Sequence, residues 1–235
     1  MEWKRIKKKL IPLIKRYRTD VEFKTRISLY SSLCINLLYV GINLLSYALY
    51  HSMWFICLGV YYVILAIMRF MLARYARQHG LGKKRRRELR RTISCSYILL
   101  TVNFALSGAV LMILYQDKGY EYHGILIYAV ALYTFYITIH AIVDLVKYRQ
   151  YKSPVMTMSK VVALSAALVS MLALETAMFS QFGQDMAPKD QWLMIALTGA
   201  GVSITVVTMS LYMIMKCTKE IKEIRGNKNG KQRDL

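Results

Sequence analysis

Hydrophobic residues along this chain fall into six long runs that are separated by short polar or basic segments. A helix needs about 20 apolar residues to cross the roughly 30 Å hydrocarbon core of a bilayer, and each run reaches about that length. The runs are too long and too continuously apolar to be strands of a membrane barrel. The pattern therefore predicts an all-α polytopic membrane protein with six transmembrane helices. We expect these helices at Ile27–Tyr50, Ser52–Arg74, Ile93–Tyr115, His123–Lys147, Val161–Phe182 and Trp192–Lys216.

A repeat relates the first, third and fifth of these helices, because similar residues recur at intervals of 67 positions. The first copy contains Thr25, Tyr30, Leu33, Asn36, Gly41 and Leu44. The second contains Thr92, Tyr97, Leu100, Asn103, Gly108 and Leu111, and the third contains Ser159, Leu164, Ala167, Ser170, Glu175 and Met178. Since the three copies cross the membrane in the same direction, we expect three parallel two-helix repeats in a pseudo-threefold bundle.

This repeat divides the chain into three helical hairpins with basic connections between them. The hairpins cover residues 27–74, 93–147 and 161–216. The other segments are an N-terminal region (1–26), two cytoplasmic linkers (75–92 and 148–160) and a C-terminal tail (217–235).

The positive charge of the chain, a formal net +20, is concentrated in segments on one side of the predicted spans. Of the 33 Lys and Arg residues, 30 lie in Met1–Arg26, Arg74–Arg91, Lys147–Lys160 and Lys216–Leu235. Connections that are rich in Lys and Arg stay in the cytoplasm when a membrane protein inserts. We therefore predict a multi-pass protein of the cell membrane with both termini in the cytoplasm.

Two of the basic segments are candidates for contact with the membrane surface. Residues 1–26 place apolar side chains on one helical face, which predicts an amphipathic helix on the cytoplasmic leaflet or, alternatively, a packed cytoplasmic collar. The run Lys83–Arg87 resembles a nucleic-acid-binding patch by composition. Its place on a short link between two spans favours anionic lipid headgroups, at about 1 kcal/mol per basic residue. We therefore expect anionic lipid, and no nucleic acid, as a partner.

Glu175 is the main candidate functional residue, because it stands within an apolar run where the other repeat copies have Gly41 and Gly108. A carboxylate is costly in hydrocarbon, so this side chain is protonated, paired or in contact with water. Either a proton-linked role or a structural hydrogen bond would fit. The glycines would leave room for this acid or allow helices to approach closely.

Small polar residues occupy one equivalent position in the three copies. They are Asn36, Asn103 and Ser170. Such residues commonly hydrogen-bond between membrane helices, and that is the simpler interpretation. The alternative is a polar lining along a pathway for a small ion or solute.

Arg69 and Asp144 lie at similar depth near the cytoplasmic ends of two predicted spans, which suggests an ion pair with either a structural or a gating role. His140 precedes Asp144 by four residues, so the two share a helical face. We expect Asp144 to orient His140, or the two to act as a proton relay. They supply only two of the roughly four ligands that zinc requires, so no metal site is predicted.

The sequence contains no phosphate-binding loop or hydrolase motif, and its connections are too short for a catalytic domain. We therefore expect neither enzymatic activity nor a cofactor. The leading hypothesis is a transporter or channel for a small ion or solute, proton-linked through Glu175. The alternatives are a non-transporting anchor or sensor that acts through its basic segments and an intramembrane lipid-modifying enzyme. A dry bundle would favour the anchor or sensor.

Overall fold

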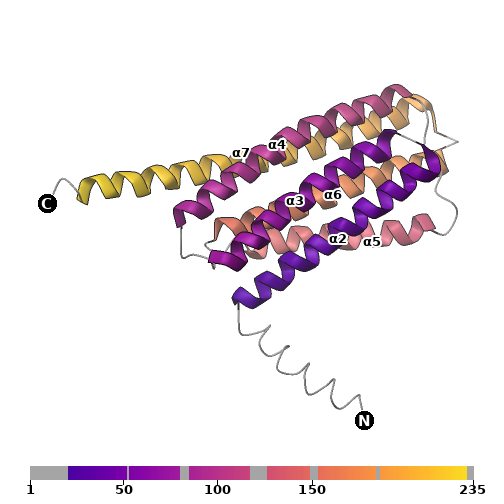
Figure 1. Cartoon of the computed structure of the whole chain (residues 1–235). Helices are drawn as coiled ribbons and strands as arrows, with labels where there is room; N and C mark the ends of the chain where they lie inside the picture. The colour runs from indigo at the N-terminus through magenta and orange to yellow at the C-terminus, as the bar shows by residue number, and fades with distance from the viewer. Residues whose placement is uncertain are drawn as a thin grey trace, which may run out of the picture.

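A computed structural model describes residues 21–51, 53–79, 85–116, 126–148, 153–183 and 186–231. These residues form six α-helices and no strand (Figure 1), which confirms the all-α prediction. The helices are α2 (Val21–Tyr50), α3 (Met53–His79), α4 (Arg85–Gln116), α5 (Leu126–Tyr148), α6 (Pro154–Phe182) and α7 (Pro188–Lys231). The expected amphipathic helix at the N-terminus lies outside the described residues, apart from its last six, which begin α2.

Three helical segments are long and apolar enough to cross a membrane. They are Trp54–Gln78, Pro154–Phe182 and Pro188–Gly226. Shorter apolar segments cover Leu33–Ala48 and Thr134–Val146. The outer surface of the bundle also exposes large apolar side chains, such as Leu38 at 65% and Leu132 at 76%. So extensive an apolar surface is unfavourable in water, and together with the long apolar helices it indicates a membrane protein with transmembrane helices.

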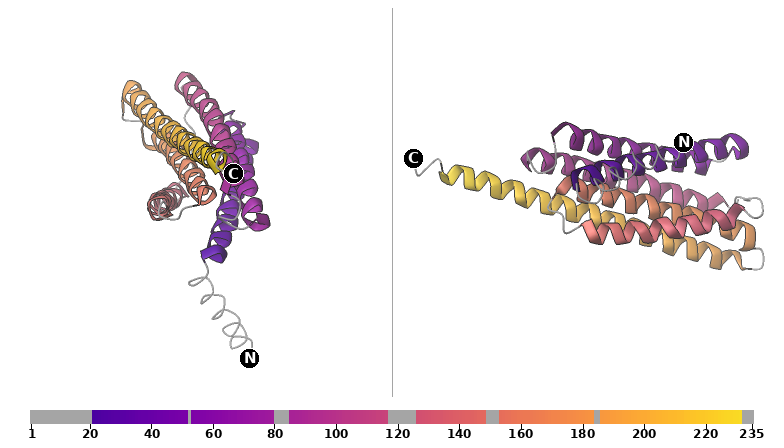
Figure 2. Two further views of the ribbon diagram at one scale, coloured as in Figure 1. Left: turned by 90° about the vertical axis from the view of Figure 1, so that its left-hand side faces the viewer. Right: turned by 90° about the horizontal axis from the view of Figure 1, so that it is seen from below.

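The six helices run up and down along a common axis (Figures 1 and 2). The starts of α2, α4 and α6 and the ends of α3, α5 and α7 lie at the same end of the bundle. We call this the basic end, because Arg85–Arg91 begins α4 there. Helix α7 has 44 residues, about 66 Å at 1.5 Å per residue, and it projects beyond the other helices (Figure 1). The segment expected as a separate tail is thus helical as far as Lys231.

Helix α6 occupies the centre of the bundle and contacts the other five helices. Its buried positions include many small residues, which allow neighbouring backbones to approach closely. They include Ser159, Ser165, Ala166, Ala167, Ser170 and Ala177. Large side chains from α3, α4 and α6 fill the space around them. Among these, Tyr62, Leu65, Leu72, Leu99, Val162 and Leu172 are at most 1% exposed.

The closest helix pairs differ from the three hairpins suggested by the sequence. Helix α2 packs on α3 as expected, but α4 packs mainly on α7, and α5 packs mainly on α6. The connection between α4 and α5, residues 117–125, is the longest between consecutive helices, and a longer connection allows the helices it joins to separate. The second hairpin is therefore not a packed pair in this structure.

Glycine permits a close approach of two helices at Gly199 in α7. A Cβ added there would lie 2.9 Å from Cγ1 of Val110 in α4, closer than side chains normally approach. A Cβ at Gly41 or Gly108 would meet no atom within 4 Å. The two repeat glycines therefore neither bring helices together nor leave room for Glu175.

We predict that Gly199→Leu lowers the thermal stability of the detergent-solubilised protein, by about 1–3 kcal/mol, because it overpacks the contact with Val110. Gly201→Leu is the matched control, since it gains the same helix propensity at a position with open space. Circular dichroism of thermal unfolding would measure the difference. Equal stability of the two variants would show that α4 and α7 do not pack as described.

Candidate functional site

The structure brings Asn36 and Ser170 together through Tyr62, a fully buried residue of α3. The hydroxyl of Tyr62 lies 2.7 Å from Oγ of Ser170 and 3.3 Å from the carbonyl oxygen of Ala166. The side-chain amide of Asn36 donates to the backbone carbonyl of Tyr62 at 3.5 Å. The ring of Tyr39 stacks on that of Tyr62, with centroids 5.2 Å apart. Helices α2, α3 and α6 are thus joined by one buried polar network.

Asn103 belongs to a different interface. Its amide donates to the carbonyl of Ser203 at 3.3 Å, and the hydroxyls of Ser107 and Ser203 lie 3.0 Å apart. These contacts join α4 to α7, whereas Asn36 and Ser170 join α2 and α6 to α3. The three equivalent residues of the repeat therefore lie in two helix interfaces, and their role as the lining of a pathway stays a prediction.

Glu175 lies half-buried on α6 and accepts a hydrogen bond from the hydroxyl of Thr198 in α7, at 3.0 Å. Ser170 precedes it by five residues, about 140° around a helix with 3.6 residues per turn. Ser170 accordingly contacts α3 while Glu175 contacts α7. The sequence does not identify Thr198 as a partner, because nothing in the repeat relates it to Glu175.

Asp144 has a different partner from the one suggested by the sequence. Its carboxylate lies 2.6 Å from Nζ of Lys160 and 3.7 Å from Nδ1 of His140. The sequence places Lys160 in the linker 148–160, but α6 begins at Pro154, so Lys160 is within a helix that packs on α5. Arg69 is buried in α3, at 3% exposure, and the described contacts of Asp144 do not include it.

His140 is on the outside of the bundle, with 60% of its side chain exposed, beside the ring of Tyr136 at 6.0 Å between centroids. Its contact with Asp144 is in keeping with the predicted i,i+4 geometry. Within the described residues, His, Cys, Asp and Glu side chains do not gather in groups of three or more that could hold a metal ion.

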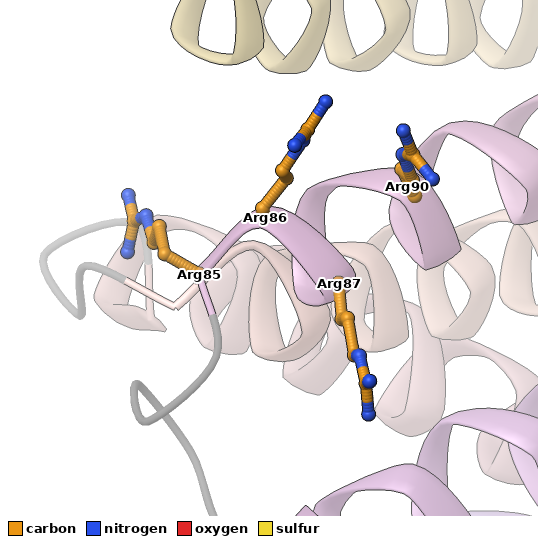
Figure 3. A pocket seen from close by; sticks show the side chains of 4 residues that line it. All are labelled: Arg85, Arg86, Arg87 and Arg90. Atoms are coloured by element: carbon orange, nitrogen blue, oxygen red, sulfur yellow. The ribbon is translucent and has the colours of Figure 1, made fainter. Parts of the chain in front are cut away.

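A pocket of about 430 Å³ lies at the basic end of the bundle, lined by Arg85, Arg86, Arg87 and Arg90 of α4. Arg86 and Arg90 are one helical turn apart and point toward the same neighbouring helix, whereas Arg87 points the other way (Figure 3). The first four backbone N–H groups of a helix have no acceptor within the helix, and its N-terminus carries a partial positive charge. Side chains and backbone therefore both favour an anion here.

A carboxylate from α7 already contacts this pocket. Oε1 of Glu220 lies 2.6 Å from Nε of Arg85, and both side chains are about one-third exposed. The contact fastens the projecting part of α7 to the start of α4. Sequence reasoning identified the basic run but not this pair, because the two residues are 135 positions apart and nothing in the repeat connects them.

No family model, curated protein or solved structure matches this chain. The fold and its polar contacts define an α-helical membrane protein with an arginine-lined pocket at one end of the bundle.

We predict that Tyr62→Phe destabilises the protein by about 0.5–1.5 kcal/mol, because it removes the buried hydroxyl that contacts Ser170 and Ala166. Tyr136→Phe removes a hydroxyl from a side chain that is 66% exposed and should change stability little. Thermal unfolding in detergent would compare them. If both variants unfold at the same temperature as the wild type, the Tyr62 hydroxyl makes no stabilising contact.

Proposed function

We propose that this chain is a six-span protein of the cell membrane that acts at the cytoplasmic surface by binding the phosphates of anionic lipids. The observation that carries the proposal is the pocket of four arginines at the start of α4. Guanidinium groups match phosphate oxygens in shape and charge, and they bind them through paired hydrogen bonds. The concentration of Lys and Arg in segments on one side of the spans supports a cytoplasmic location for this end and for both termini.

The polar residues of the interior support an anchor or sensor more than a transport pathway. The amides of Asn36 and Asn103 donate to backbone carbonyls of neighbouring helices, and Ser170 contacts the hydroxyl of Tyr62. Such contacts hold membrane helices together without requiring water or a solute. The three-repeat layout is supported by the sequence repeat, whereas the helix contacts do not follow it, because α4 packs mainly on α7 and α5 mainly on α6.

To test this proposal, we would reconstitute the full chain in liposomes and compare its association with spin-labelled phosphatidylglycerol and phosphatidylcholine by electron paramagnetic resonance. We expect a preference for the anionic lipid of at least roughly fivefold, equivalent to about 1 kcal/mol, and weaker at high ionic strength. Replacing the four pocket arginines with glutamine should reduce it, whereas Lys189→Gln, at the opposite end, should not. Equal association of both lipids would contradict the proposal.

A second candidate function, proton-linked transport of a small ion or solute, is favoured by Glu175. This acid lies in an apolar helix and makes a hydrogen bond to Thr198 of an adjacent helix. An intramembrane carboxyl that can exchange its proton is a common element of proton-coupled transport. Under this alternative, Asn36, Asn103 and Ser170 would line part of the pathway, and Asp144 and His140 would relay protons near its cytoplasmic end.

Proton flux in proteoliposomes under an imposed potential, followed with a pH-sensitive dye, tests this candidate. The wild type should exceed protein-free vesicles, and Glu175→Gln should reduce the flux to their level because it removes the exchangeable proton. Ser180→Ala, a change on the same helix, provides the control. Unchanged flux in the Glu175→Gln protein would reject a role of Glu175 in proton transport.

A further inference from the structure

The arginine pocket is an open, local concentration of positive charge close to the expected start of a span. Arg90 and Arg85 precede Ile93, the expected start of a span, by three and eight residues, which is about 4–12 Å of helix. The headgroup region adds about 5–8 Å on each side of the hydrocarbon core. Arginine side chains can reach several ångströms further along the helix axis. A headgroup phosphate and the pocket can therefore meet without any change in the bundle.

The charge balance of the pocket indicates which kind of phosphate it fits. Arg86 and Arg90 point toward the same neighbouring helix, Arg87 points the other way, and Arg85 is paired with the carboxylate of Glu220. The pocket therefore offers an incoming anion a surplus of two positive charges, those of Arg86 and Arg90. The N-terminus of α4 adds about half a charge more. A phosphodiester headgroup carries a single negative charge and leaves most of the surplus uncompensated. A phosphate monoester carries a charge of about −1.5 to −2 and has three acceptor oxygens, so it compensates more of the surplus positive charge.

The geometry of the four side chains suits a ligand with several oxygens. Arg86 and Arg90 point together toward a neighbouring helix, so both can reach the same phosphate from one side (Figure 3). Arg85 is held by Glu220 at 2.6 Å, which shows that an anion has access to this guanidinium. The pocket, about 430 Å³ in volume, is open to the surroundings, so a headgroup can enter it from outside the bundle.

We propose that Arg85, Arg86 and Arg90 form a binding site for the phosphate monoester headgroup of a lipid, with Glu220 as a built-in competitor for Arg85. This inference rests on the proposed function and makes it more specific, since it replaces general attraction to anionic lipid with recognition of one phosphate class. A partly exposed ion pair contributes little stability, so an incoming phosphate can displace Glu220 from Arg85. Ligand binding therefore competes with the ion pair between Arg85 of α4 and Glu220 of α7.

The test is isothermal titration calorimetry of the detergent-solubilised full chain with three probes. Short-chain phosphatidic acid carries a phosphate monoester, short-chain phosphatidylglycerol carries a diester with the same acyl chains, and pyrophosphate is soluble. We expect phosphatidic acid to bind at least about tenfold more tightly than phosphatidylglycerol, because hydrogen bonds between charged groups are the strong ones. Pyrophosphate should bind more weakly than phosphatidic acid, because it lacks the acyl chains that reach the apolar surface.

Two pairs of variants connect the binding to the pocket. Arg86→Gln with Arg90→Gln should weaken binding of phosphatidic acid roughly tenfold or more. Arg74→Gln with Arg77→Gln, two exposed arginines of α3, is the control with equal loss of charge. Glu220→Gln should strengthen binding several-fold by removing the competitor, whereas Glu223→Gln, an exposed neighbour on the same helix, should not. Thermal unfolding of each variant checks that the bundle is intact.

Four outcomes would overturn the inference, and the last of them would also contradict the proposed function. Equal binding of phosphatidic acid and phosphatidylglycerol would exclude recognition of the monoester while leaving the proposed function intact. Pyrophosphate binding as tightly as phosphatidic acid would reject a lipid as the ligand. Unchanged or weaker binding in the Glu220→Gln protein would reject the role of Glu220. Absence of binding by both lipids would count against the proposed function itself.

Discussion

Hydrocarbon cannot accept or donate hydrogen bonds, and this constraint governs the whole bundle. Each polar group within a span must find its partner in its own helix or in a neighbouring one. Many hydroxyls use their own helix, as Ser96, Ser165 and Ser210 donate to carbonyls four residues earlier. The side-chain amides of Asn36 and Asn103 instead donate hydrogen bonds to backbone carbonyls of adjacent helices. The polar residues therefore specify which helices meet.

The central place of α6 follows from the same constraint combined with size. Serine and alanine at its buried positions let five neighbours approach, and the hydroxyls among them offer hydrogen bonds to those neighbours. Because these positions of α6 are small, the hydroxyl of Tyr62 in α3 can contact both Ser170 and the carbonyl oxygen of Ala166. Helices α2 and α5 lie outside and leave large apolar side chains for lipid to cover. The bundle is thus organised around one helix rather than around an empty axis.

Sequence patterns predicted the helical class and, to within one residue, the C-terminal ends of α2, α4, α5 and α6, because length and hydropathy are local properties. The starts of α2, α4, α6 and α7 lie four to eight residues before the expected ones. The sequence patterns did not predict the packing of α4 on α7, which includes a contact between Gly199 and Val110, two residues 89 positions apart in the sequence. The partner of Asp144 was also missed, since Lys160 lies within α6 rather than in a linker. Glu175 stands out in the sequence by its charge within an apolar run and by its place in the repeat, but its partner Thr198 is defined only by the packing of α6 on α7. Local chemistry was thus predictable, while tertiary partners were not.

Charge segregation links the fold to the proposed function, because the arginines from which we infer the membrane orientation also line the pocket. The proposed function requires that this basic end faces the cytoplasm. The most direct test places single cysteines in a variant without the four native ones, at Gln78 near the basic end or at Met186 at the other end, both exposed. A membrane-impermeant maleimide applied to intact cells should label Met186→Cys, and Gln78→Cys only after permeabilisation. Labelling of Gln78→Cys in intact cells, with Met186→Cys protected, would contradict the account.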